Sequence, residues 1–308
     1  VLIIFFIVVF ALGLLIPVVI IFICENMNTR VRGRKDLESV TVPFIGEIPL
    51  FTRKKKGIFR KKPQEVRAIV VKEGSRDIIN EAFRVLRTNL EFMTGKDKAS
   101  NVIIVTSFNP GSGKSFLTMN IAVSFAIKGK KVLVIDGDLR HGSASSYIDS
   151  PTKGLSDYLG GRIDNLNEII VTNPKQKYLD ILPVGTIPPN PTELLFDDRL
   201  KQVIDTVREQ YEYVLIDCPP IELVADTQII EKLADRTIFV GRAVLLELNM
   251  LAELEIIYGE KKYKNMSLIL NGTEGSGGRY GYRYGYRYGY HYGYGSEYHY
   301  GSDEKYIE

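Results

Sequence analysis

Residues 106–115 read Thr-Ser-Phe-Asn-Pro-Gly-Ser-Gly-Lys-Ser, and this stretch decides the fold. It follows an apolar run at 102–106 that is typical of a buried strand, and it opens a helical pattern over 115–128. Glycines at 111 and 113 let backbone N–H groups face phosphate oxygens, and the N-terminus of the helix adds a partial positive charge. The order of strand, glycine-rich loop and helix therefore predicts a phosphate-binding P-loop rather than a chance Gly-Ser-Gly-Lys-Ser turn.

The P-loop assigns roles to particular side chains. Lys114 is expected to reach the β- and γ-phosphates of ATP, and the Ser115 hydroxyl is expected to bind Mg²⁺. The other loop residues expected to hold the nucleotide are Pro110, Gly111, Ser112, Gly113 and Phe116. One position departs from the usual pattern G-x-x-x-x-G-K-[ST], because Phe108 stands where the first glycine is expected.

Two further apolar runs end in carboxylates. Residues 132–138 read Val-Leu-Val-Ile-Asp-Gly-Asp, so that Asp136 and Asp138 lie on the same side of an extended chain. Residues 213–217 read Tyr-Val-Leu-Ile-Asp and end in Asp217. The carboxyl ends of parallel strands line the ligand crevice of an open sheet. We therefore expect the three carboxylates to converge on Mg²⁺ and on an incoming hydroxyl, although each alone could be an acidic loop residue.

The pattern from residue 76 to residue 271 is that of an α/β domain. Short apolar runs predict strands at 102–106, 132–135, 179–183, 213–216, 237–240 and 267–270. Helical patterns lie at 76–92, 115–128, 192–210, 225–234 and 248–258. Continuous apolar strands that alternate with helices predict a P-loop NTPase-type fold, a mostly parallel sheet with helices on both faces.

The first 24 residues carry no charge and predict a transmembrane helix. At ~1.5 Å per residue they would span roughly 36 Å, more than the ~30 Å of a hydrocarbon core. A buried core helix is the alternative. Positive charge after the run predicts that the C-terminal side is cytoplasmic. The two cysteines, Cys24 and Cys218, are too few for a disulfide framework, which also favours a reducing compartment. Because the chain does not begin with Met, we expect a piece of a longer protein.

Residues 25–75 predict a juxtamembrane linker, because Pro43, Gly46, Pro49 and Gly57 interrupt any long periodicity. Between 29 and 62, eleven Lys or Arg residues stand against three acids, a net charge of +8 in a chain whose total is +3. The run Arg-Lys-Lys-Lys-Gly-Ile-Phe-Arg-Lys-Lys at 53–62 suits anionic lipid head groups, with a merely solvated linker as the alternative. The adjacent membrane helix makes lipid a nearer polyanion than nucleic acid, and no nucleic-acid partner is expected.

The composition changes abruptly after Asn271. Residues 272–278 predict a flexible joint, and the motif Arg-Tyr-Gly-Tyr then occurs three times, followed by His-Tyr-Gly-Tyr. Eleven of the eighteen tyrosines lie here: Tyr280, Tyr282, Tyr284, Tyr286, Tyr288, Tyr290, Tyr292, Tyr294, Tyr298, Tyr300 and Tyr306. With no aliphatic residue before Ile307, the segment 272–308 cannot build a core, and we predict that it is disordered.

Together, these motifs resemble those of the bacterial tyrosine kinases. Residues 110–115, 135–140 (Ile-Asp-Gly-Asp-Leu-Arg) and 216–220 (Ile-Asp-Cys-Pro-Pro) look like that family's Walker A, A′ and B motifs. Residues 81–87 are similar to its E-x-x-R-x-x-R oligomerisation motif, which consists of Glu81, Arg84 and Arg87 here. The resemblance takes in Gly-Thr-Ile-Pro-Pro-Asn-Pro-Thr-Glu-Leu-Leu at 185–195 and the tyrosine-rich tail, and the H-R-D and D-F-G motifs of eukaryotic-type kinases are absent.

The resemblance implies an ATP- and Mg²⁺-dependent tyrosine kinase that phosphorylates its own tail tyrosines in trans. It implies that Lys114 is catalytic and that Asp136 or Asp138 orients or deprotonates the tyrosine hydroxyl. Ser115, Asp136, Asp138 and Asp217 form the implied Mg²⁺ set, with Asp217 acting through water, and Asn271 is expected to contact the adenine.

The resemblance also implies partners and a location. The kinase domain (76–271) is expected to form a ring of identical subunits. The segment 1–24 resembles the last transmembrane helix of a polysaccharide co-polymerase, or chain-length-determinant, module. The implied setting is the bacterial inner membrane, with the kinase domain and tail in the cytoplasm. The polysaccharide polymerisation and export machinery and a phosphotyrosine phosphatase are then expected partners.

Two other functions remain open at this point. A membrane-linked regulatory ATPase of the partition or septum-site type shares the fold and hydrolyses ATP without phosphorylating itself. Such proteins carry a second lysine five residues before the P-loop lysine, where this chain has Asn109. A nucleotide-sensing adaptor would use the tail only for docking. The missing lysine and the tyrosine-rich tail favour the kinase.

Overall fold

The computed structural model describes residues 29–51, 68–94, 101–173, 176–221 and 225–274, together with 13–19 and Ile3, Phe6 and Phe10. The basic run at 53–62, the eleven tail tyrosines and most of the predicted transmembrane segment lie outside these residues. Residues 13–19 are helical. Within the described ranges, no helix has the length and apolar character that a membrane span requires.

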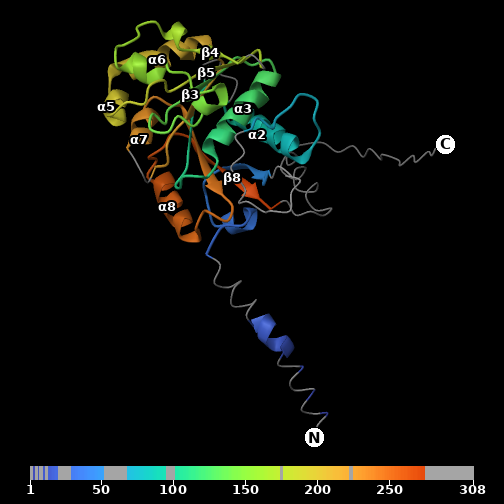
Figure 1. The fold of residues 1–308 in the computed structure, drawn as a ribbon. Coiled ribbons are helices and arrows are strands. Elements are labelled where there is room, and N and C mark those ends of the chain that lie inside the picture. Colours follow the sequence, from blue (N-terminus) through green and yellow to red (C-terminus); the bar gives the residue numbers. More distant parts are fainter. Residues whose placement is uncertain are drawn as a thin grey trace, which may run out of the picture. The chain divides into compact units, whose positions relative to one another are not determined.

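A single sheet forms the centre of the folded unit, and eight of its strands lie in the described part of the chain (Figure 1). The order is β1-β8-β7-β2-β6-β3-β5-β4, and every neighbouring pair is parallel except β4 and β5. The strands are β1 (Phe44–Pro49), β2 (Asn101–Thr106), β3 (Val132–Asp136), β4 (Val171–Thr172), β5 (Leu179–Leu182), β6 (Tyr213–Asp217), β7 (Arg236–Arg242) and β8 (Met266–Thr273). Strands β3 and β6 are buried throughout, which explains their unbroken apolar sequences.

Helices cover both faces of this sheet, with a hydrophobic cluster under each layer (Figure 1). They are α2 (Ile78–Thr94), α3 (Lys114–Ile127), α4 (Leu155–Leu159), α5 (Pro191–Leu195), α6 (Asp198–Gln210), α7 (Asp226–Glu231) and α8 (Leu248–Gly259). Helices α2 and α3 share one cluster with Ile103 and Val105 of β2, and α4–α8 share the other with Val102 and Ile104. Successive side chains of β2 thus serve opposite faces, as the pleat of a strand requires.

The predicted α/β class and mostly parallel sheet are confirmed. Each of the six predicted strands corresponds to an observed one, β2, β3, β5, β6, β7 or β8. The helix predicted over 192–210 is two helices, because Asp197 caps α6 by accepting a hydrogen bond from the Arg199 amide at 2.8 Å. Short elements such as β4 and α4 were missed because their sequences are too short for a periodic signal.

The predicted linker at 25–75 is wrong in part, because β1 lies inside it and pairs in parallel with β8 at the edge of the sheet. Ile45 and Ile48 of β1 are buried in the cluster beneath α2. The strand was not predicted because Gly46 and Pro49 interrupt its sequence pattern. An edge strand, however, tolerates proline and irregular register. The register of the pairing does shift beside Gly46 and before Pro49.

The segment before α2 also belongs to the folded unit. Asn120 of α3 accepts hydrogen bonds from the amides of Val70 (2.7 Å) and Val71 (3.2 Å) and donates to the carbonyl of Ala68 (3.1 Å). Val70 and Val71 are buried in the same cluster as α2 and α3. The folded unit therefore begins well before the predicted boundary at residue 76.

Candidate functional site

The conformation of the P-loop depends on Gly113 and on Asn271, which is distant in the sequence. Gly113 has a φ of 88°, and a Cβ at this position would lie 2.2 Å from Nδ2 of Asn271, so a side chain cannot fit. That Nδ2 donates to the Ser112 carbonyl at 2.9 Å, and the Ser112 hydroxyl donates to the Asn109 carbonyl at 2.7 Å. Asn271 was predicted to contact adenine. Its observed contact braces the P-loop, and the adenine contact stays a prediction.

The remaining loop residues lie where a phosphate site needs them. Lys114 and Ser115 open α3 directly after Gly113, with Lys114 only 9% exposed. Pro110 and Gly111 are exposed at the mouth of the loop. Phe116 is half-buried, and its ring packs edge-on against Phe83 of α2, so only its backbone is available to a phosphate.

Phe108, which replaces the usual first glycine, belongs to the hydrophobic core. It is 1% exposed and packs edge-on against Phe239 of β7, with the ring centroids 4.8 Å apart. The departure from the P-loop pattern thus adds packing under the loop.

Two acidic strand ends meet beside the P-loop. Asp136 at the end of β3 is in register with Asp217 at the end of β6, and the Gly137 amide donates to the Asp217 carbonyl at 2.9 Å. A Cβ on Gly137 would lie 2.9 Å from Cγ2 of Ile216, so only glycine permits this close approach. Strands β3 and β6 therefore end side by side, as the sequence predicted.

The two carboxylates are buried and incompletely hydrogen-bonded. Asp136 Oδ2 accepts from the amide and the hydroxyl of Ser145, both at 2.6 Å, whereas Asp136 Oδ1 has no partner. Both oxygens of Asp217 are buried without a hydrogen bond of normal geometry. Burial and the charge of Asp217 raise the pKa of Asp136 well above its ordinary value, despite the Ser145 hydrogen bonds. Burial likewise raises the pKa of Asp217, opposed by the Ser115 hydroxyl and the charge of Lys114.

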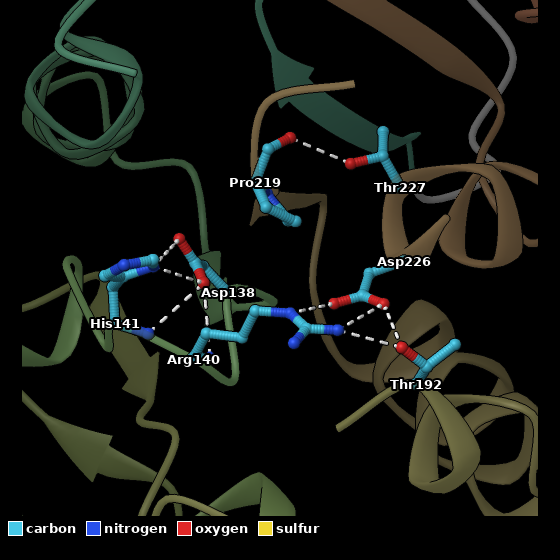
Figure 2. Close-up of polar contacts among 7 residues, drawn as sticks. All are labelled: Asp138, Arg140, His141, Thr192, Pro219, Asp226 and Thr227. Atoms are coloured by element: carbon cyan, nitrogen blue, oxygen red, sulfur yellow. Dashed lines mark hydrogen bonds and ion pairs between the residues drawn. The ribbon is translucent and has the colours of Figure 1, made fainter. Parts of the chain in front are cut away.

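Asp138 is engaged in a tight turn that we call the Asp138 loop (residues 136–142). Its Oδ1 accepts from the backbone amides of Arg140 and His141, both at 3.2 Å, and Nδ1 of His141 lies 3.3 Å from both carboxylate oxygens (Figure 2). Within the described ranges, no three His, Cys, Asp or Glu side chains gather as a ready metal site. The three carboxylates therefore share one end of the sheet without converging, and their assignment to a metal stays a prediction.

The three residues of the predicted oligomerisation motif lie on α2. Glu81 and Arg84 form an ion pair, and Arg84 also donates to the carbonyl of Ser75. Arg87 turns toward α3, where its Nη1 donates to the Ser124 carbonyl at 2.7 Å while its Nε is buried without a partner. These side chains therefore have partners within the chain, and their contact with another subunit stays a prediction.

Several site residues could not be predicted from local motifs. Arg242 at the end of β7 has its Nη1 3.6 Å from the place that a Cβ on Gly113 would occupy, which adds a second cation beside the P-loop. Ser145 holds Asp136, and Arg140 of the Asp138 loop binds the buried Asp226 of α7. The only sequence signal for these contacts was Arg140 within the A′-like motif, since the partners lie far apart in the chain.

Comparison with known proteins agrees with this geometry. Residues 100–241 match a family model described as an AAA domain. Tyrosine-protein kinase YwqD of Bacillus subtilis is 35% identical over 209 residues, which are 68% of this chain and 87% of YwqD. Tyrosine-protein kinase Etk of Escherichia coli is 32% identical over 245 residues, or 76% of this chain.

The solved structures extend the match to three dimensions. The kinase domain of the E. coli tyrosine kinase Etk superposes with a TM-score of 0.69 at 29% identity, covering 86% of this chain and all of that domain. The chain spans about a third of the full length of Etk and of other large relatives. The match to nearly all of YwqD, together with the P-loop and the two acidic strand ends, places this chain in the family of bacterial tyrosine-protein kinases.

Proposed function

We propose that this protein transfers the γ-phosphate of ATP to the tyrosines of its own tail, acting in trans between subunits. The observation that carries the proposal is the P-loop with buried, partly unpartnered carboxylates at one sheet end, in a chain with eleven tail tyrosines. A hydrolase requires only the first of these features. The family of the chain supports the kinase over the regulatory ATPase.

The side chains suggest how transfer occurs. Lys114 stabilises the phosphate charge, and the P-loop backbone amides hold the phosphate oxygens. Free tyrosine has a pKa near 10, so a carboxylate does not readily remove the hydroxyl proton before attack. We therefore propose that the carboxylate accepts this proton as the transition state forms. We assign the acceptor role to Asp138, because it is 7% exposed and its Oδ2 accepts from no backbone amide of the described residues, whereas Asp136 is fully buried against Ser145.

Mg²⁺ fits the donors that the site offers. Three buried carboxylate oxygens of Asp136 and Asp217 lack normal partners, and the Ser115 hydroxyl lies beside Asp217. Mg²⁺ prefers oxygen ligands and usually binds through one or two carboxylates plus substrate phosphates. The ion would neutralise charge that develops on the phosphoryl oxygens.

The tail and the linker give the proposal its cellular form. The 37 residues 272–308 could reach roughly 120 Å when extended, so that a neighbour's site is within range. Unmodified, the charges of 279–308 balance, and each phosphotyrosine adds about −1.5 to −2. We propose that crowded phosphorylated tails repel one another and disperse a ring assembled through Glu81, Arg84 and Arg87.

We further propose a setting for this cycle. The uncharged run at 1–24 anchors the chain in the bacterial inner membrane, and the basic run at 53–62 contacts anionic lipids. Cycles of assembly, phosphorylation and removal of phosphate by a phosphotyrosine phosphatase then regulate the length and export of a capsular or exopolysaccharide.

A mixing experiment tests the proposal. The chain is incubated with Mg-ATP and probed for phosphotyrosine, alone and mixed with a tagged Lys114→Met chain. We expect label on the tagged inactive chain and a monomeric fully phosphorylated form. ATP hydrolysis without phosphotyrosine would identify a regulatory ATPase, binding of ATP without turnover an adaptor, and an unlabelled inactive chain would exclude transfer in trans.

A further inference from the structure

The first two residues of α7 contact the two loops that follow the acidic strand ends. Asp226 binds the side chain of Arg140, which belongs to the Asp138 loop (Figure 2). Thr227, the next residue, donates from its hydroxyl to the carbonyl of Pro219 at 2.8 Å. Pro219 lies in the segment that follows Asp217, which we call the Asp217 loop (residues 217–221). One short helix therefore holds the two loops that carry the candidate carboxylates.

The contact with the Asp138 loop is an ion pair between a buried carboxylate and a partly exposed arginine. Asp226 is 0% exposed, and its Oδ2 accepts from Nε of Arg140 at 3.1 Å. Nη2 of Arg140 donates to the Thr192 hydroxyl of α5 at 2.9 Å, and that hydroxyl donates to Asp226 Oδ1 at 2.6 Å. The three side chains form a closed network, in which the planar guanidinium permits one orientation.

This network fixes the part of the chain that orients Asp138. The backbone amide of Arg140 donates to Asp138 Oδ1, so the residue whose side chain is held by Asp226 also holds the carboxylate. A shift of Arg140 therefore moves a hydrogen-bond donor of Asp138 directly. Figure 2 shows the Arg140 side chain crossing from the Asp138 loop to Asp226 and Thr192.

The contact with the Asp217 loop consists of two neutral hydrogen bonds. The Pro219 carbonyl accepts from Thr227 of α7 and also from the Thr106 hydroxyl at the end of β2, both at 2.8 Å. Thr106 and Thr227 are both fully buried. The loop after Asp217 is thereby fixed between the strand that leads into the P-loop and the helix that binds Arg140.

We infer that Asp226 and Thr227 are positioning residues for phosphoryl transfer, with Arg140 and Thr192 completing the contact to Asp138. Together they set the separation of the Asp138 and Asp217 loops, and thus of the proton acceptor from the metal-binding side of the site. The inference rests on the proposed kinase function. Phosphoryl transfer is sensitive to such placement, because an error of about 1 Å can cost roughly 100-fold in rate.

The test compares hydroxyl-deleting variants with variants that keep the hydroxyl. Thr192→Val should lower the rate of phosphotyrosine formation at saturating Mg-ATP roughly 10- to 100-fold. Thr227→Val should raise the Mg²⁺ concentration needed for half-maximal rate several-fold, because it releases the Asp217 loop. Thr192→Ser should retain at least half of the wild-type rate of phosphotyrosine formation. Thr227→Ser should need no more than about twice the wild-type Mg²⁺ concentration for half-maximal rate. Asp226→Asn should lower the rate to the same extent as Thr192→Val. If Asp226→Asn does not fold, the valine variants still decide the test.

A matched control uses another arginine–aspartate pair on the same side of the sheet. Arg162→Gln breaks the ion pair of Arg162 with Asp157 (2.9 Å), whose carboxylate otherwise accepts from Gly154 and Thr186 and touches neither acidic loop. This variant should retain wild-type rates. Titration with a fluorescent ADP analogue should give affinities within about twofold for every variant, and melting temperatures should differ by only a few degrees.

Each outcome decides between roles. Wild-type chain that forms no phosphotyrosine overturns the proposed function and this inference with it. Active wild type with fully active valine variants overturns the inference alone. Serine variants as impaired as the valine variants, or a parallel loss of ADP affinity, would reduce α7 to general structural support and also overturn it.

Discussion

Buried carboxylate oxygens at the phosphate-binding end of the sheet lack normal hydrogen-bond partners, whereas the charged side chains on helix α2 have partners. At the sheet end, Asp136 Oδ1 and both oxygens of Asp217 are buried without a normal hydrogen bond. On α2, Glu81 pairs with Arg84, and Arg87 binds Ser124. A buried acceptor left unsatisfied costs about 1–3 kcal/mol. The buried carboxylate oxygens at the sheet end would therefore be stabilised by a bound cation, whereas the charged side chains of α2 already have partners within their own chain.

The contrast separates two kinds of functional residue. A ligand site is recognisable from one chain, because its buried groups lack partners until the ligand arrives. A subunit contact made by α2 must exchange an internal partner for an external one, so that assembly gains only the difference. Exposed ion pairs contribute about 0–1 kcal/mol each, and we therefore expect a ring that assembles weakly and dissociates on dilution.

The largest effect should come from Lys114→Met. Loss of the main cation at the γ-phosphate should lower phosphotyrosine formation at least about 100-fold. Circular dichroism and oligomer size should stay as in the wild type, because the change lies at the sheet end. A protein that keeps near-normal phosphotyrosine would mean that the catalytic site lies elsewhere.

Replacement of Glu81, Arg84 and Arg87 together by Ala tests the other side of the comparison. Light scattering should show conversion from ring to monomer, while affinity for a fluorescent ADP analogue stays within about twofold. Ser124→Ala is the matched control, since it removes the hydroxyl partner of Arg87 but leaves the carbonyl partner. A triple variant that still assembles would exclude the interface role.

A smaller effect is expected from Asp217→Asn in chain freed of metal and nucleotide. Burial raises the pKa of Asp217 to about 7 on folding, so this carboxyl makes the folded state progressively less stable as pH rises from about 4 to about 7, and the loss is complete above that range. The variant should melt several degrees above the wild type at pH 8 and about equally at pH 4, below which the carboxyl is protonated in both states. Adding Mg-ADP should stabilise the wild type more than the variant. An unchanged melting temperature at pH 8 would show that the carboxylate is solvated or paired.

How far the sequence predicts the molecule depends on how local the signal is. The end of β2, the P-loop and the ends of β3 and β6 were predictable, because an unbroken apolar strand that ends in aspartate or leads into a glycine-rich loop carries its signal within a short stretch of sequence. Strand β1 was not, since its stability comes from β8, more than 200 residues away. The contacts of Asp226 with Arg140 and of Asn271 with Ser112 also need the fold, because the partners lie 86 and 159 residues apart in the chain.

The smallest effect concerns the start of α2. Asp77 accepts from the Asn80 amide at 2.9 Å, and Asp77→Ala should cost about 1 kcal/mol of unfolding free energy in denaturant titrations. Slight burial opposes the shift, but hydrogen bonds from Ser75 and Asn80 lower the pKa of Asp77 to about 2. Its contribution is therefore complete above pH 4 and is lost as pH falls toward 2. Equal stability of both proteins at pH 7 would contradict the capping role.

The pairing of β1 with β8 has a consequence for chain segments beyond the sheet. The Leu50 amide donates to the Thr273 carbonyl at 2.8 Å, so the two strands end side by side. The basic run begins three residues after Leu50, and residue 275 follows two residues after Thr273. An attraction between the basic run and the phosphorylated tail of the same chain would be a reaction within one molecule. Salt would weaken it, but dilution of the protein would not.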